Sequence, residues 1–189
     1  MSVIAPEAPA APVAPAKKVV TVATAWLDGC SGCHMSFLDI DERILELAPL
    51  IKVVYSPLVD NKVFPDWVDV TIIEGAIATD DDLAKVRKIR AHTGFLIALG
   101  DCAITTNVPG MRNPIGLEGV SEAAYGSLER LPRTGLPTLL PKVMPIHAAA
   151  KVDLFVQGCP PPADAIYHAL AELVAGRKPE LAGLTRLGA

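Results

Sequence analysis

Strand-like and helix-like segments alternate along this chain, and the alternation limits the fold to few architectures. The strand-like segments are rich in β-branched residues and lie at residues 18–25, 51–55, 67–73, 94–99 and 152–156. Helical spacing of apolar residues follows at residues 36–48, 79–92 and 163–175. Helices between successive strands act as crossover connections, so the pattern predicts an α/β fold with a flavodoxin-like, doubly wound parallel sheet of about five strands.

The prolines mark the boundaries of the predicted domain. Residues 1–17 are mostly Ala and Pro, which predicts a disordered tail, and residues 18–189 are predicted to form a single domain.

Residues 103–151 form a long Pro/Gly-rich insertion before the last strand, with one short helix expected at about residues 121–130. Because a loop of this length is uncommon in a compact domain, it either wraps the sheet edge or forms a partner surface. Ser36 and Asp39 form an expected capping pair for the helix at residues 36–48.

Composition and charge exclude several classes of protein. The net charge of −4 and the 5% of aromatic residues argue against binding to nucleic acid. No apolar run reaches the roughly 20 residues that a membrane span requires. The start of the chain lacks the basic region of a secretory signal, so we expect a cytoplasmic protein. Cysteines in that compartment stay reduced and tend to be ligands or catalysts.

All four cysteines of the chain come directly after predicted strands. Cys30 and Cys33 form a C-x-x-C pair after the first strand, Cys102 follows the fourth, and Cys159 follows the fifth. The carboxyl ends of parallel strands share one edge, where ligands bind in open sheets. We therefore expect the four thiols to lie together. A glycine precedes each cysteine by one or two residues, which allows the backbone to approach a bulky inorganic group closely.

Several kinds of site remain open on spacing alone. A thioredoxin-type dithiol would leave Cys102 and Cys159 unexplained. A cysteine–zinc interaction module without redox activity usually takes two local pairs, and this chain has only one. Cysteines that are merely buried need no flanking glycines. A four-thiolate iron–sulfur cluster accounts best for the spacing, with the zinc module as the alternative.

Four motifs resemble the small subunit of nickel–iron hydrogenases, above all the short, NAD-reducing cytoplasmic type. They are LDGCSGCHMSFLDIDE at residues 27–42, EGAI at 74–77, GDCA at 100–103 and GCPP at 158–161. The related 20 kDa iron–sulfur subunit of complex I shares the fold and the late cysteines. That subunit has two adjacent cysteines where this chain has C-x-x-C, and it stays a further alternative.

The resemblance implies a function in electron transfer. Cys30, Cys33, Cys102 and Cys159 would bind one proximal 4Fe–4S cluster, next to a Ni–Fe centre that belongs to a separate large subunit. Electrons would leave through diaphorase subunits that carry iron–sulfur clusters and FMN. The chain would then be a subunit of a hydrogen:NAD⁺ oxidoreductase that contributes no catalytic residue of its own.

Other residues near the predicted site have more than one interpretation. Glu74, at the end of the third strand, is either an ordinary loop acid or a redox-dependent iron ligand or proton-coupled neighbour of the cluster. We expect Asp101 to cap a loop and His34 to face solvent. An FMN in this subunit is not favoured, because Cys30 and Cys33 occupy the loop that would hold its phosphate.

Overall fold

The computed structural model describes residues 19–188, so the predicted tail at residues 1–17 lies outside the described residues. Single-domain organisation over residues 18–189 stays a prediction. The strands are β1 (Val20–Trp26), β2 (Ile51–Tyr55), β3 (Val68–Glu74), β4 (Ile77–Thr79), β5 (Thr93–Leu99), β6 (Leu139–Met144) and β7 (Leu154–Val156). The α-helices are α1 (Gly32–Leu38), α2 (Ile44–Leu47), α3 (Asp80–Ala91), α4 (Gly100–Thr105), α5 (Asn107–Gly110), α6 (Gly116–Tyr125) and α7 (Ala163–Val174). The described residues also form the 3₁₀ turns η1 (Asp41–Arg43), η2 (Leu128–Arg130) and η3 (Ile146–Ala148).

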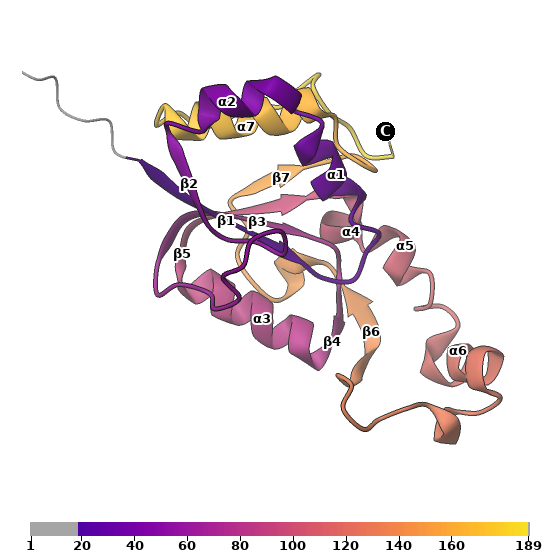
Figure 1. The fold of residues 1–189 in the computed structure, drawn as a ribbon. Coiled ribbons are helices and arrows are strands. Elements are labelled where there is room, and N and C mark those ends of the chain that lie inside the picture. The colour runs from indigo at the N-terminus through magenta and orange to yellow at the C-terminus, as the bar shows by residue number, and fades with distance from the viewer. Residues whose placement is uncertain (1–18, 189) are drawn as a thin grey trace, which may run out of the picture.

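Five strands form one parallel sheet in the order β2-β1-β3-β5-β7 (Figure 1). This order is that of flavodoxin-like doubly wound sheets, so the predicted fold class is confirmed. Each predicted strand of the sheet lies within two residues of an observed one. The carboxyl ends of β1, β3, β5 and β7 lie along one edge.

Helices cover both faces of the sheet and define two apolar layers. On one face α1, α2 and α7 pack over a cluster that includes Ile72, Ile97 and Leu99 (Figure 1). On the other face α3 packs over a cluster that includes Leu96 and Ala98. Neighbouring residues of β5 thus point to opposite faces, and both faces are buried, as in α/β sheets with crossover helices.

The predicted continuous helix at residues 36–48 is wrong. The structure has α1, η1 and α2 instead, and α1 begins at Gly32 rather than at Ser36. Asp41 has a φ of +54°, which a right-handed helix does not allow, so the backbone changes direction there. Ser36 is not a cap either, because it lies inside α1 and its hydroxyl donates to the Pro161 carbonyl at 2.5 Å.

The long insertion is more structured than expected. β4 and β6 pair antiparallel into a small second sheet, and α4, α5 and α6 lie between β5 and β6. In Figure 1 the part with α6 and β6 projects from the main sheet as a lobe. The expected helix at residues 121–130 is displaced: α6 ends at Tyr125 before Gly126, whose φ is +83°. β4 was missed because its three residues are too few to show a periodicity.

Candidate metal centre

The fold positions each cysteine at the carboxyl edge of the main sheet. Cys30 lies in the loop after β1, and Cys33 lies in the first turn of α1. Cys102 lies in α4, which begins directly after β5. Cys159 lies in the loop between β7 and α7. Topology thus brings together residues that are far apart in the sequence, as expected.

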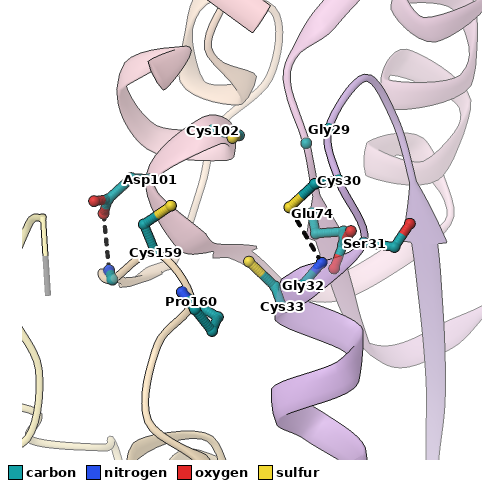
Figure 2. Close-up of a pocket in the computed structure, with 12 residues that line it drawn as sticks. Gly29, Cys30, Ser31, Gly32, Cys33, Glu74, Asp101, Cys102, Cys159 and Pro160 are labelled. Carbon is teal, nitrogen blue, oxygen red and sulfur yellow. Dashed lines mark hydrogen bonds between the residues drawn. The ribbon is translucent and has the colours of Figure 1, made fainter. Parts of the chain in front are cut away.

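The four cysteines line one hollow. Figure 2 shows their sulfur atoms arranged around a shared space, each approaching from a different side. The remaining lining residues are Gly29, Ser31, Gly32, Glu74, Gly75, Asp101, Gly158 and Pro160. All four thiols are free. Within residues 19–188, no three His, Cys, Asp or Glu side chains converge closely enough to hold a single metal ion.

Two glycines that line this hollow have no room for a side chain. Gly100 has a φ of +81°, and a Cβ there would lie 2.2 Å from Cys33 Sγ. Gly158 has a φ of +130°, and a Cβ there would lie 2.6 Å from Pro161 Cα. Neither position tolerates a side chain without moving a cysteine or its loop. The glycines beside the cysteines therefore allow the backbone to lie close to the hollow.

Burial and mutual proximity perturb two of the thiols. Burial raises the pKa of Cys33, and the neighbouring Glu74, Cys102, Cys30 and Cys159 raise that pKa further. Burial also raises the pKa of Cys102, although a hydrogen bond from the Val108 backbone opposes this rise. Without a cation the sulfurs of Cys33 and Cys102 are thus held as neutral thiols. A positively charged metal group would reverse this balance and bind them as thiolates.

Backbone and side-chain N–H groups lie close to three of the four sulfurs. The Gly32 N–H is 3.4 Å from Cys30 Sγ, and Asn107 Nδ2 is 3.4 Å from Cys159 Sγ. The Val108 N–H lies near Cys102. Donors to sulfur stabilise a negatively charged metal–thiolate group. Sequence reasoning missed Asn107, which no spacing or motif marks.

Asp101 ties the Cys102 segment to the Cys159 loop. Its Oδ1 accepts from the Gly158 N–H at 2.8 Å, and its own N–H donates to the Gly158 carbonyl at 2.9 Å. Its Oδ2 accepts from the Gly188 N–H at 2.7 Å. The carboxylate is buried among these donors. The expectation that Asp101 caps a loop is confirmed.

The expectation that His34 faces solvent is wrong. His34 is 2% exposed and Glu74 is 3% exposed. The Glu74 Oε2 accepts from the His34 backbone N–H at 2.6 Å and lies 2.7 Å from His34 Nδ1. The Trp26 ring packs edge-to-face on the imidazole at 5.3 Å between centroids. Glu74 therefore lines the hollow and also anchors the start of α1; its predicted role as a metal ligand stays a prediction.

The donor set of the hollow fits a polynuclear iron–sulfur group. Four thiolates are the usual ligand set of a 4Fe–4S cluster, in which each cysteine binds a different iron. Such ligands surround a volume, and the four sulfurs here do so (Figure 2). Gly100 leaves free the space beside Cys33 Sγ that a side chain would fill. The residues present are thus chemically and sterically compatible with the group.

Comparison with known sequences gives a consistent set of relatives. The family described as NADH ubiquinone oxidoreductase, 20 Kd subunit, matches residues 30–173. The delta subunit of the NAD-reducing hydrogenase HoxS from Cupriavidus necator is 36% identical over 167 residues, which cover 84% of this chain and 80% of the relative. A subunit of the F420-non-reducing hydrogenase vhu from Methanocaldococcus jannaschii is 36% identical over 168 residues. These cover 86% of this chain but only 58% of that longer relative.

Solved structures agree with the sequence comparison. A chain of an NAD⁺-reducing NiFe-hydrogenase in the H₂-reduced state matches with a TM-score of 0.81 and 38% identity, covering 86% of this chain and 95% of that one. A Dm. baculatum NiFeSe-hydrogenase chain matches with a TM-score of 0.53 at 18% identity, which shows a shared fold. The resemblance to hydrogenase small subunits is thereby confirmed, and the chain belongs to the family of the NADH ubiquinone oxidoreductase 20 Kd subunit.

Proposed function

We propose that this chain is the electron-transfer subunit of an NAD-linked nickel–iron hydrogenase. Cys30, Cys33, Cys102 and Cys159 would bind one 4Fe–4S cluster, and a separate large subunit would carry the Ni–Fe centre. The observation that carries the proposal is the arrangement of four free thiols, from three strand ends, around one hollow. The relatives that are 36–38% identical are, by name, NAD-reducing or F420-non-reducing hydrogenases, which supports this direction.

The protein's own contribution would be to hold and insulate the cluster. When bound, the cluster supplies reversible one-electron transfer. Gly100 and Gly158 give the backbone close access, and Asp101 fixes the Cys102 and Cys159 segments relative to each other. Glu74 would act beside the cluster, either as a proton-coupled neighbour or as a redox-dependent ligand.

An apolar rim beside the hollow fits a protein partner. We call it the rim patch: Met35, Leu38, Val108, Met111 and Ile115, all of them exposed, on α1, on α5 and in the segment after α5. Figure 1 shows α1, α4 and α5 close to the carboxyl edge of the sheet. Exposed apolar groups that adjoin a functional site are typical of protein interfaces. The rim patch would bind the large subunit, which would also keep the cluster dry.

The route that electrons take after the cluster and the compartment in which the protein works are part of the same proposal. Electrons would pass to diaphorase subunits that carry iron–sulfur clusters and FMN, and then to NAD⁺ in the cytoplasm. In the part of the chain that the structure describes, no helix is long and apolar enough to cross a bilayer. A hydrogenase partner would be recognised by hydrogen-dependent NAD⁺ reduction, whereas a complex I-like subunit would support quinone reduction instead.

Metal analysis tests the proposal directly. Full-length chain purified without oxygen should contain about four iron and four sulfide per chain and give an EPR signal on reduction. Cys102→Ser should lose that signal while far-UV circular dichroism shows the sheet retained. Ser127→Ala, a substitution before η2 and outside the hollow, serves as the control and should keep the cluster. A colourless chain with one zinc and no EPR signal would favour the zinc module and contradict the proposal.

A further inference from the structure

Residues 106–108, which join α4 to α5, lie close to two different cysteines. Asn107 Nδ2 donates to Cys159 Sγ at 3.4 Å, across 52 positions of sequence. The backbone N–H of the next residue, Val108, lies near Cys102. One short segment therefore adjoins half of the thiols around the hollow. We call residues 106–108 the donor segment.

The backbone of the donor segment is held in an unfavourable conformation. Thr106 has a φ of +71° and Asn107 a φ of +28°, so two successive residues other than glycine occupy the left-handed region. Asn tolerates this region better than most residues, whereas β-branched Thr is disfavoured there. Without the turn at these residues, α4 would continue as a helix and the Asn107 amide would point elsewhere.

Contacts on both sides hold this conformation. The Thr106 N–H donates to the Cys102 carbonyl at 3.1 Å, and the Gly110 N–H donates to the Thr106 carbonyl at 3.0 Å. Gly110 also leaves room for the threonine, since a Cβ there would lie 2.1 Å from Thr106 Oγ1. Strained backbone that its surroundings enforce is common at functional sites. Here the strain coincides with donors aimed at sulfur.

We propose that the donor segment, and Asn107 above all, raises the reduction potential of the bound iron–sulfur cluster. The inference rests on the proposed function, because it requires a cluster on these cysteines. N–H dipoles directed at thiolate sulfur stabilise negative charge. The reduced cluster carries one electron more than the oxidised cluster, so these donors favour the reduced state. Asn107 is thus a tuning residue that acts through Cys159.

Redox titration of the full-length chain, purified without oxygen and followed by EPR, tests the tuning role. Asn107→Gly removes the donor but keeps a residue that adopts the left-handed region freely. Its midpoint potential should become more negative, so that the ratio of reduced to oxidised cluster at a fixed potential falls about three- to tenfold. Asn61→Gly is the matched control, because it makes the same substitution at an exposed asparagine that does not line the hollow. It should leave the midpoint unchanged.

A second variant separates tuning from folding. Asn107→Asp keeps the shape and replaces the donor with a negative charge, so its midpoint should lie below that of Asn107→Gly. An unchanged midpoint in both variants would overturn the inference, and so would loss of the cluster from both, which would indicate a role in assembly. A wild-type chain that binds no iron–sulfur cluster would instead refute the proposed function. The two failures are therefore distinguishable.

Discussion

At the scale of single residues, Glu74 has two roles, and only its place at the end of a strand can be predicted from the sequence. It lines the hollow with the cysteines, and it accepts hydrogen bonds at the buried start of α1 from His34. The cysteines were found from sequence because strand topology alone brings them to one edge. The pairing of Glu74 with His34 depends on how α1 approaches β3, and no local pattern encodes that approach.

Substitution of Glu74 should reveal its structural role separately from any redox role. Glu74→Leu leaves the His34 N–H and Nδ1 buried without their acceptor, so the free energy of unfolding should fall by about 2–4 kcal/mol. Glu74→Gln retains an acceptor oxygen and should cost about 1 kcal/mol or less. Chemical denaturation of the cluster-free chain measures both values. Equal losses in the two variants would show that the hydrogen bonds do not account for the effect.

At the scale of elements, long periodic segments were predicted well and interrupted ones were not. Helix α3 lies within one residue of its predicted bounds. Its N-cap Thr79 and the Asp82 side chain form a capping box, which fixes the start of the helix. The helix predicted at residues 36–48 failed because apolar spacing says nothing of the left-handed Asp41. The break separates α2 from α1, the helix that places Cys33 at the hollow.

One ion pair connects α3 to the strands and should make stability depend on pH. Asp153 Oδ2 lies 2.6 Å from Arg90 Nη1 and accepts from the Leu96 N–H at 2.9 Å. Burial raises the pKa of Asp153, but Leu96 and Arg90 outweigh burial and hold the pKa below its usual 3.8. The carboxylate therefore stabilises the fold above about pH 4, and this contribution is lost as the pH falls through the lowered pKa.

Asp153→Asn tests this linkage. At pH 7 the substitution should lower the free energy of unfolding by about 1–2 kcal/mol, because the ion pair with Arg90 becomes a hydrogen bond to a neutral acceptor. Below pH 4 the wild type also loses its charge, so the difference between the two proteins should shrink. Denaturant titrations from pH 7 to pH 3 measure the difference. A gap that stays constant over this range would contradict the assignment.

At the scale of the whole molecule, the cysteine-lined hollow lies where the main sheet meets the insertion. Cys30, Cys33 and Cys159 lie near α1 and β7, while Cys102 lies in α4, which continues into the insertion and through α5 to the lobe. The sequence left open whether the insertion wraps the sheet or forms a partner surface. Val108, Met111 and Ile115 in its first part are exposed, as the second interpretation expects, and a partner surface there stays a proposal. Such exposure could not be predicted, because it depends on where the lobe projects.

The position of the rim patch predicts where the large subunit binds, which exposure alone does not predict. Met111 and Leu45 are each 70% exposed. Met111 directly follows α5, near the carboxyl edge of the sheet, whereas Leu45 lies on α2, over the sheet face that α7 also covers (Figure 1). Met111→Lys should weaken binding to a co-expressed hydrogenase large subunit by about ten- to a hundredfold, because the interface would bury an unpaired charge. Leu45→Lys adds the same charge away from the interface and should bind like the wild type. Both variants should keep the cluster and the wild-type melting temperature. Equal binding by the two variants would place the large subunit on another face of the molecule.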